Sequence, residues 1–441
     1  MKKMFSFLSI NQKDRFRVVD GVRALSLIIV VLGHLFHFHH PNFTSVEGFA
    51  GFSIFSGFFR SDLAVDAFFV ISGFLIGSLL FKELLSFGKI SFKRFYIRRF
   101  FRLMPVYFFV VLIGILFVYI ISVSDNPAAE KMNLNLMIAN FWTNLLYINN
   151  FIPIENQFLG WCWSLAVEEQ FYLIAPIFVS ALFFLKSKNK ILWTFISLLI
   201  VSFIVRGAVV WENNLFGPNF WGAVGSDSWN NTFSVLYDNL YTRYGGLLIG
   251  VFASYFYVMR FAGVKSHFEK TGLSSFLFFI SCFLFLTVFL KLNYLSFYNN
   301  SSFGAFDFFP VTEGVRKHLF VIIVSSSRSV FSASLMYIIL FLMLRELKRP
   351  LFLKRFLSSS FFFYIAQISY SAYLIHPFIM LPLFHYFTKF ILLYTQNLFV
   401  VFFINSSLAV VLIFVSSYLM YRYIEIPFMK IRNKKFLSRI Y

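Results

Sequence analysis

The stretch DGVRALSLIIVVLGHLFHFHH, residues 20–40, is apolar at nearly every position between Val22 and Phe38. A helix needs about 20 apolar residues to cross the hydrocarbon core of a bilayer, so this stretch predicts a membrane-spanning helix. Two side chains interrupt the apolar run, the guanidinium of Arg23 and the imidazole of His34. A membrane helix that carries both groups indicates a bundle with a polar interior.

Arg23 and His34 are eleven residues apart. At about 100° per residue they lie on the same face of a helix, about 16 Å apart along its axis. An arginine at the centre of a membrane helix costs about 2.5–3.5 kcal/mol, so such residues usually face a polar cavity. Histidine is also the side chain best suited to move protons near neutral pH. The alternative is structural: His34 bonds a neighbouring helix while Arg23 extends to the inner interface.

The composition excludes an ordinary soluble globule. Hydrophobic residues make up 59% of the 441 positions and charged residues 13%, and the mean hydropathy is +0.75. These values are typical of a polytopic membrane protein. The net charge of +20 does not indicate nucleic-acid binding, because most basic residues flank apolar runs.

Ten apolar windows are long enough to cross a bilayer. They fall near residues 22–39, 63–81, 104–123, 161–185, 191–210, 236–258, 272–291, 319–344, 365–388 and 398–421. The sequence therefore predicts an all-α fold, a polytopic bundle of about ten transmembrane helices. We expect one membrane domain over residues 22–425, flanked by cytoplasmic segments at 1–21 and 426–441.

The two sets of loops differ in their basic residues. The segments 1–21, 82–103, 186–190, 259–271, 345–355 and 422–441 hold 5, 7, 3, 3, 5 and 6 of the 39 lysines and arginines. Lys and Arg concentrate in cytoplasmic loops, so both termini are predicted to be cytoplasmic. The lack of a small-residue cleavage site favours an uncleaved first helix over a signal peptide. We expect a multi-pass protein of the inner (plasma) membrane.

One outer segment has no clear assignment. Residues 136–150, LMIANFWTNLLYINN, are apolar but interrupted by polar side chains. Such a segment can lie in the membrane interface or re-enter the membrane. The sequence alone leaves open whether it spans or re-enters.

The inner loop 82–103 ends in a cluster of arginines, FKRFYIRRFFRLMP. On a helix Arg98 and Arg102 share a face, and Arg99 lies three residues before Arg102. Guanidinium groups bind phosphates in a bidentate manner, so the cluster predicts a binding site for a phosphorylated cytosolic cosubstrate. The alternative is a topological anchor that contacts anionic lipid.

The fourth predicted span carries two adjacent acids in WCWSLAVEEQFYLIAP, residues 161–176. Glu168 and Glu169 point about 100° apart on a helix, so they do not form one closely spaced carboxylate pair. We expect one acid to face the cavity and the other to pair with an intramembrane arginine. Candidate partners are Arg23, Arg206, Arg243 and Arg328. An ion pair that orients helices explains at least one acid equally well.

Other spans also carry polar residues. Asp66 lies near the outer start of the second span, ahead of a small face that favours close packing. This face consists of Ser72, Gly73 and Gly77. His376 precedes Pro377, which frees a backbone carbonyl near it, so the sequence favours a structural role for this histidine. Glu425 is a further polar residue at the edge of the last span.

No metal site is expected. His37, His39 and His40 are spaced so that a helix does not bring the three imidazoles together, and no carboxylate or cysteine supports them. Cys162 and Cys282 lie in or beside apolar segments and imply neither a disulfide framework nor a thiolate site.

Seven motifs, in this order, resemble those of acyltransferase family 3. This family of integral membrane O-acyltransferases includes acetylases of O-antigen and other cell-surface glycans. The motifs are DGVRALSLIIVVLGH (20–34), DAFFVISGFLIG (66–77), FYIRRFFRLMPVY (95–107), WSLAVEEQFYLIAP (163–176), TRYGGLLIG (242–250), ISYSAYLIHP (368–377) and YIEIP (423–427). The similarity extends over nearly the whole chain, and ten spans with cytoplasmic termini agree with the architecture that it implies.

The resemblance implies which residues are catalytic. The family's essential Arg-x10-His pattern falls on Arg23 and His34, and its Glu-Glu pair falls on Glu168 and Glu169. We expect these four residues to form the catalytic group. Further polar residues expected to contact substrate or support the site are Asp66, Trp163, Ser164, Arg243 and His376.

The resemblance also implies a donor and an acceptor. The family's inner Arg-x-x-Arg motif is linked to acyl-CoA use, so the phosphates of acetyl-CoA, or of another acyl-CoA, are expected to bind Arg98, Arg99 and Arg102. His34 would act as a general base on an acceptor hydroxyl or as a transient acyl carrier. The acceptor would be a cell-envelope glycan or glycolipid, such as lipopolysaccharide O-antigen, that enters from the outer side.

The chain looks like the stand-alone form of the family, without the soluble esterase-like domain that follows the membrane domain in some members. Either a separate periplasmic partner completes the transfer, or the membrane domain acylates its acceptor directly. Two other functions stay open, a transporter or flippase of a lipid-linked glycan and an acyltransferase that acts on a lipid, an antibiotic or a small metabolite. We expect contact with membrane lipid and none with nucleic acid.

Overall fold

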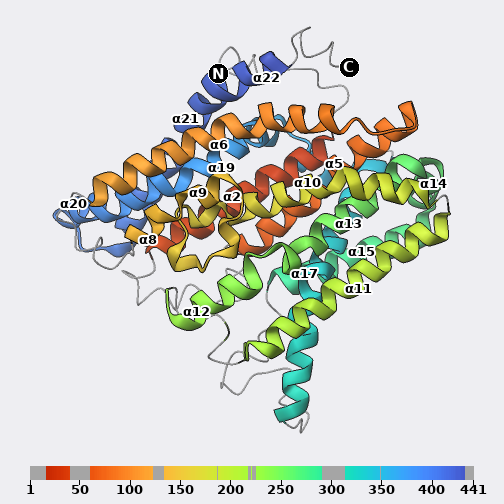
Figure 1. Cartoon of the computed structure of the whole chain (residues 1–441), viewed down its shortest axis with the longest axis horizontal. Coiled ribbons are helices and arrows are strands. Elements are labelled where there is room, and N and C mark those ends of the chain that lie inside the picture. Colours follow the sequence, from red (N-terminus) through yellow and green to blue (C-terminus); the bar gives the residue numbers. More distant parts are fainter. Residues whose placement is uncertain are drawn as a thin grey trace. The chain divides into compact units, whose positions relative to one another are not determined.

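The computed structural model describes residues 16–39, 60–122, 134–185, 187–216, 220, 225–290, 313–347 and 349–432. Within these ranges the chain forms helices and contains no β-strand (Figure 1). The predicted all-α fold is therefore confirmed. The predicted domain boundaries stay a prediction, and residues 1–15 and 433–441 of the terminal segments lie outside the described ranges.

Nine helical segments within the described ranges are long and apolar enough to cross a membrane. Their main helices are α2 (Arg17–His39), α5 (Ser61–Phe87), α6 (Phe92–Ser122), α10 (Trp163–Phe184), α11 (Lys188–Glu212), α15 (Thr271–Phe289), α17 (Glu313–Leu344), α19 (Ser360–Pro382) and α21 (Leu398–Met420). A tenth candidate is the pair α13 (Leu240–Met259) and α14 (Phe261–Glu269), which meet at a bend of 96°. The predicted polytopic bundle is confirmed, and the cytoplasmic position of the termini stays a prediction.

The last two candidate spans each contain a π-helical turn. Helix α19 continues through the π-turn η11 (Leu383–Phe387) into α20 (Thr388–Leu392). Helix α21 continues through the π-turn η12 (Tyr421–Glu425) into α22 (Ile426–Arg432). Such turns inside α-helices occur frequently at functional sites.

The chain divides into two compact units. Unit 1 comprises residues 1–68, 92–110 and 339–441, and unit 2 comprises residues 69–91 and 111–338. The chain passes from one unit to the other within helices α5, α6 and α17, and also between Ser91 and Phe92, where α6 begins. Each unit therefore collects segments that are far apart in the sequence.

In unit 1, α2 packs along α19, and α19 also packs against α21 (Figure 1). Gly21 lets α2 approach the short helix α18 (Phe352–Leu357), because a Cβ at this position would collide with the carbonyl of Leu357. Completely buried apolar residues of these long helices include Leu27, Val30, Leu35, Leu374 and Ala409. The packing of α2 on α19 brings His34 to His376.

In unit 2, α13 packs against α10 and α11. The part of α5 that belongs to this unit crosses α13 with almost no space between the two backbones. A Cβ at Gly73 would collide with the carbonyl of Leu247, and a Cβ at Gly250 would collide with that of Val70. The small face predicted on the second span is thus used for close helix packing.

The described part of the segment between α6 and α10, residues 134–162, consists of short pieces. They are α8 (Leu134–Ala139), α9 (Phe141–Leu145), η6 (Asn149–Phe151), η7 (Ile154–Asn156) and η8 (Gly160–Cys162). A helix of n residues is about 1.5n Å long, so none of these pieces can cross a bilayer. Of the arrangements left open by the sequence, a membrane span at 136–150 is excluded.

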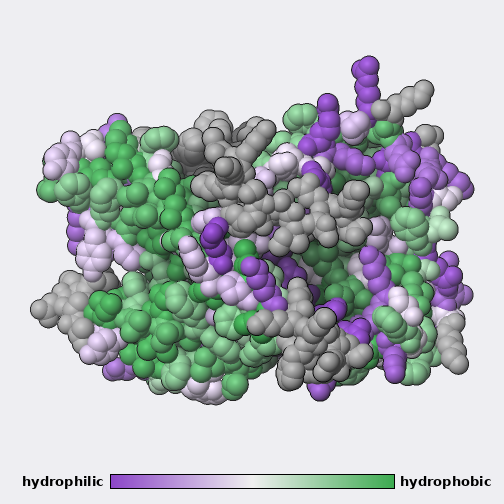
Figure 2. Space-filling model, turned by 90° about the horizontal axis from the view of Figure 1, so that it is seen from above, coloured by the Kyte–Doolittle hydropathy of each residue, from purple (hydrophilic) through white to green (hydrophobic). Residues whose placement is uncertain are grey.

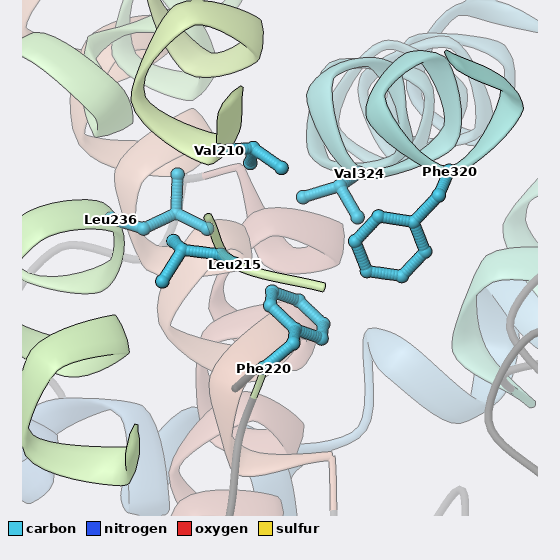
Figure 3. Packing of buried hydrophobic residues seen from close by; sticks show 6 residues of the cluster. All are labelled: Val210, Leu215, Phe220, Leu236, Phe320 and Val324. Atoms are coloured by element: carbon cyan, nitrogen blue, oxygen red, sulfur yellow. The ribbon is translucent and has the colours of Figure 1, made fainter. Parts of the chain in front are cut away.

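A hydrophobic cluster in unit 2 joins the end of α11 to the π-turn η10 (Phe233–Tyr237) and to α17 (Figure 3). Its buried members are Val210, Leu215, Phe220, Leu236, Phe320 and Val324. In the view of Figure 2 the surface is hydrophobic over large areas, and many of its exposed side chains are Phe, Leu and Ile. An exterior of this kind fits helices that face lipid acyl chains.

Candidate functional site

The imidazoles of His34 and His376 meet inside unit 1. Nδ1 of His34 and Nε2 of His376 are 2.8 Å apart, which is a hydrogen-bonding distance. The two rings lie within 15° of parallel, with their centroids 5.0 Å apart. His376 is completely buried, whereas His34 is half-buried. The structure thus joins the histidine predicted to be catalytic to one that the sequence favoured as structural.

The backbone of α19 holds the far side of the His376 ring. Nδ1 of His376 lies 2.7 Å from the carbonyl oxygen of Tyr373 and 3.3 Å from that of Ala372. Pro377 has no N–H, so it provides no helical donor for the Tyr373 carbonyl four residues before it. The carbonyl that the sequence expected Pro377 to free is therefore the one that contacts His376.

Unit 1 also contains a buried carboxylate next to basic side chains. Glu425, at the end of the π-turn η12, is 6% exposed and accepts a hydrogen bond of 2.5 Å from the hydroxyl of Ser371. The charges of Arg102 and Arg23 act on this carboxylate. One acid thus lies within electrostatic range of Arg23, from the predicted catalytic pattern, and of Arg102, from the inner arginine motif.

The three arginines of the inner motif differ in burial. Arg98 is exposed on α6, whereas Arg99 and Arg102 are half-buried. The guanidinium of Arg99 lies over the ring of Phe95, 5.9 Å from its centroid. Of the three guanidinium groups, those of Arg99 and Arg102 are therefore more shielded from solvent.

Two hydroxyl groups hold the carboxylate of Glu168 in unit 2. The hydroxyl of Ser72 donates to Oε1 at 2.7 Å, and the hydroxyl of Tyr172 donates to Oε2 at 3.1 Å. Glu168 and Glu169 are both half-buried. Because both of its oxygens have a defined hydrogen-bond donor, the Glu168 carboxylate has a fixed orientation.

Aromatic rings surround the guanidinium of Arg243 in the interior of unit 2. The guanidinium carbon lies 5.5 Å from the ring centroid of Phe69, 5.1 Å from that of Trp163 and 4.7 Å from that of Tyr237. These distances fall within the range of cation–π contacts. Arg328 also lies over Tyr237, at 5.3 Å. Two residues predicted to support the site, Trp163 and Arg243, are thus in direct contact.

Asp238 is the centre of a buried polar network between η10 and α13. Its two carboxylate oxygens accept hydrogen bonds from the amides of Gln157, at 2.9 Å, and of Asn239, at 3.2 Å. Its backbone carbonyl accepts a hydrogen bond from Asn150. Asp238 is completely buried, and this burial raises the pKa of its carboxyl group to about 8, although Gln157 and Arg243 act in the opposite direction.

The remaining predicted polar residues are buried in different units. Asp66 is 2% exposed in unit 1, and Ser164 is 4% exposed in unit 2. Arg206, one of the four arginines considered as partners for Glu168 or Glu169, donates to the backbone carbonyls of Thr242 and Val324. Within the described ranges, no three His, Cys, Asp or Glu side chains form a group that could hold a metal ion. The side chains of His37, His39 and His40 lie outside what the structure describes.

Sequence reasoning missed several of these partners. Ser371 and Ser72 are ordinary helix residues in the sequence, and only the fold shows that each contacts a carboxylate. Asp238 lies in the window 236–258, which was predicted to span the membrane, whereas α13 begins at Leu240. For His376, the sequence offered the His376-Pro377 dipeptide. This dipeptide indicated a backbone carbonyl freed near His376 but not the contact of His376 with His34.

Comparison with known proteins yields one family. Residues 16–422 match a family model described as an acyltransferase domain. Among curated proteins, the chain is similar to the O-acetyltransferase OatA of Staphylococcus aureus strains NCTC 8325 / PS 47 and MRSA252, with 33% identity over 215 residues in each. The alignment covers 48% of this chain and 32% of each relative, so the chain matches about a third of their length. No solved structure matches.

Proposed function

This chain belongs to the acyltransferase family whose model it matches, and from that premise we propose that it is an integral membrane O-acetyltransferase. It transfers an acetyl group from cytosolic acetyl-CoA to a hydroxyl of a cell-envelope glycan, in the plasma membrane. The names of the curated relatives support the O-acetyl chemistry. The many candidate spans support a reaction that takes place within a membrane.

The observation that carries the proposal is the contact of His34 with His376. His34 is the histidine of the pattern that the resemblance identifies as essential, and it lies 2.8 Å from a second imidazole. An imidazole with an oriented ring is the commonest general base in enzymes. A hydrogen bond to a neighbouring helix would also satisfy a structural histidine. What supports a catalytic role is that His34 is half-buried, whereas its partner His376 is completely buried.

In the proposed reaction the acceptor hydroxyl attacks the thioester carbonyl of acetyl-CoA. His34 takes the hydroxyl proton as the new C–O bond forms, and the C–S bond then breaks. His34 returns the proton to the departing thiolate, so the products are an acetyl ester and free CoA thiol. If His34 instead carries the acetyl group, its ring nitrogen attacks the thioester first, and the C–S bond breaks to release the CoA thiolate. The acceptor hydroxyl then attacks the acetyl-imidazole, the C–N bond breaks to restore the imidazole, and the hydroxyl proton goes to the thiolate.

The donor is proposed to bind through the inner arginines. Arg99 and Arg102 are half-buried and therefore better shielded from solvent than Arg98, which strengthens charge-assisted hydrogen bonds to phosphate. The carboxyl group of Glu425 interacts electrostatically with both Arg102 and Arg23. It would hold these two guanidinium groups in place before the anionic donor arrives.

The acceptor is proposed to contact the acidic helix α10. Glu168, fixed by Ser72 and Tyr172, would accept a hydrogen bond from a sugar hydroxyl. Glu169 and Asp66 are proposed to bind or orient the same substrate. A separate periplasmic partner is required only if the membrane domain does not acylate the glycan directly.

The test uses the purified full chain in lipid nanodiscs with radiolabelled acetyl-CoA. We expect CoA thiol release that depends on an added envelope glycan, together with transfer of label to that glycan. A strain that lacks the protein should lose the corresponding acetyl groups from its envelope glycans in mass spectra. Glycan movement across the bilayer without thiol release would contradict the proposal and favour a transporter.

A further inference from the structure

We propose that His376 is a positioning residue that fixes His34 in one tautomer, with the proton on Nδ1 and the lone pair on Nε2. The tautomer follows from the hydrogen bonds alone, and its role in catalysis rests on the proposed function. The argument starts from the backbone of α19 and proceeds outward to His34.

The first step is the backbone acceptor. Pro377 has no N–H, so the Tyr373 carbonyl one turn earlier has no helical donor at position 377. His376 Nδ1 lies 2.7 Å from that carbonyl oxygen and 3.3 Å from the Ala372 oxygen. A carbonyl oxygen can only accept a hydrogen bond, so the proton must be on Nδ1 of His376.

The second step is the far side of the same ring. A neutral imidazole carries one N–H, so Nε2 of His376 has the lone pair and is an acceptor. The side chain is completely buried, and an imidazolium is costly in such surroundings. Nε2 therefore accepts the hydrogen bond that joins it to His34.

The third step fixes His34. Its Nδ1 lies 2.8 Å from Nε2 of His376, so Nδ1 of His34 is the donor and carries the proton. The ring centroids are 5.0 Å apart, close to the largest separation that this nitrogen distance permits, and the planes are 15° from parallel. The two nitrogens thus lie near the line between the ring centres, which is the geometry of an in-plane hydrogen bond.

The consequence concerns the reacting nitrogen. With its proton on Nδ1, His34 presents Nε2 as the base toward the acceptor hydroxyl. When Nε2 takes a proton, the imidazolium keeps its Nδ1–H bond to His376, whose ring is held by the Tyr373 carbonyl. This relay orients the base in the way that a buried acid orients the histidine of a serine protease. Here the Tyr373 carbonyl, which Pro377 leaves without a helical donor, takes the place of the buried acid and holds the His376 ring.

The direct test is nitrogen-15 NMR of histidine-labelled protein in lipid, with the His34 signals assigned by their loss in His34→Ala. We expect His34 to show a protonated Nδ1 and an unprotonated Nε2, and this pattern should disappear in His376→Phe. A proton on Nε2 of wild-type His34 would overturn the proposal. The NMR spectrum reports the tautomer whether or not the protein turns over substrate. A protein that shows the expected tautomer but transfers no acetyl group would contradict the proposed function and leave the tautomer assignment intact.

The kinetic test compares two substitutions of His376. His376→Phe keeps the ring shape without its nitrogens, and we expect kcat to fall about 100-fold while KM for acetyl-CoA stays within twofold. His376→Gln offers an amide that can donate to the Tyr373 carbonyl and accept from His34. The kcat of His376→Gln should therefore be about tenfold higher than that of His376→Phe. Equal losses in the two variants, both with wild-type melting temperatures, would overturn the positioning role.

Pro377→Ala tests the fixed end of the relay without touching an imidazole. The new N–H competes for the Tyr373 carbonyl, so we expect a mixture of His34 tautomers and a kcat lowered about threefold to tenfold. Pro382→Ala is the matched control, because it makes the same change in α19 one and a half turns further on. The control should keep wild-type kcat. If Pro377→Ala leaves the tautomer unchanged, the proposed role of the carbonyl is wrong.

Discussion

The His34–His376 pair of unit 1 and the Asp238 network of unit 2 are both polar groups inside a largely apolar bundle, but they are built differently. Asp238 is completely buried, and side-chain amides from several segments contact its carboxylate and its backbone. In the histidine pair only His376 is completely buried, and half-buried His34 lies at its end. The completely buried Asp238 network suits a structural role. The His34–His376 pair, in which one histidine is partly accessible, suits proton transfer.

The largest effect is expected from His34→Ala. Removing a general base typically costs about 10²–10⁴-fold in rate, so acetyl transfer should fall by about three orders of magnitude. Stability should fall by about 1–3 kcal/mol, because the completely buried His376 loses its hydrogen bond to His34. CoA thiol release by purified protein in nanodiscs measures the first effect, and a thermal melt measures the second.

His318→Ala is the control for that experiment. His318 is an exposed histidine of α17 whose Nδ1 lies 2.7 Å from the carbonyl of Gly314 in its own helix. Its loss should leave both thiol release and melting unchanged. An active His34→Ala protein would show that His34 is not required for catalysis. The histidine pair and the Asp238 network would then no longer differ in function.

The next effect concerns donor binding. Arg99→Ala and Arg102→Ala each remove a charge-assisted hydrogen bond to phosphate, worth about 1.5–3 kcal/mol. We expect KM for acetyl-CoA to rise about 10- to 100-fold, with a smaller change in kcat. Lys93→Ala, on the exposed side of the same helix, should change neither constant. Isothermal titration of acetyl-CoA into the purified protein checks the binding step, and wild-type affinity in both arginine variants would contradict the donor site.

The sequence predicted the spans well because bilayer thickness acts on long stretches of chain. The hydropathy of a window can be summed without knowledge of tertiary contacts. Charge bias in the loops bears on the orientation of the spans, which stays a prediction. The ends of short elements were less predictable, as the start of α13 at Leu240 shows against the expected 236. There the apolar residues of η10 extend the hydrophobic window beyond the helix that spans.

The site was only partly predictable, since its residues come together through packing between helices. The spacing of Arg23 and His34 within one helix follows from α-helical geometry alone. The contact of His34 with His376 depends on the register of α2 against α19, which residues far apart in sequence determine. The same holds for Ser72 and Glu168, whose contact no local pattern reveals.

Asp238 should make the stability of the protein depend on pH. Its carboxyl group has an ordinary pKa of 3.8 when unfolded and a pKa of about 8 in the native protein. Between these values the unfolded chain releases a proton that the native protein keeps, so stability is greatest at low pH and falls as pH rises toward 8. We expect a loss of about 2 kcal/mol between pH 6 and pH 8.

Asp238→Asn removes this titration and keeps a side chain that the neighbouring amides can bond. Its melting temperature should therefore vary less between pH 6 and pH 8 than that of the wild type. Asp227→Asn, an exposed acid in the first turn of α12 (Asp227–Thr232), should keep the wild-type dependence. Identical pH profiles for Asp238→Asn and the wild type would show that the network does not hold a protonated acid.

The smallest effect is expected where a hydroxyl orients the Glu168 carboxylate. Ser72→Ala removes a hydrogen bond of 2.7 Å to Oε1 and leaves the Tyr172 bond to Oε2 in place. One such bond is worth about 1 kcal/mol, so kcat/KM for the glycan should fall about threefold to tenfold while KM for acetyl-CoA stays constant. Ser78→Ala is the matched control in the same helix, because the buried Ser78 hydroxyl has no hydrogen-bond partner among the described residues. Glycan titrations at saturating acetyl-CoA measure the difference. If both variants behave alike, Glu168 does not orient the acceptor, and the Ser72 contact belongs with the Asp238 network as a feature of the fold.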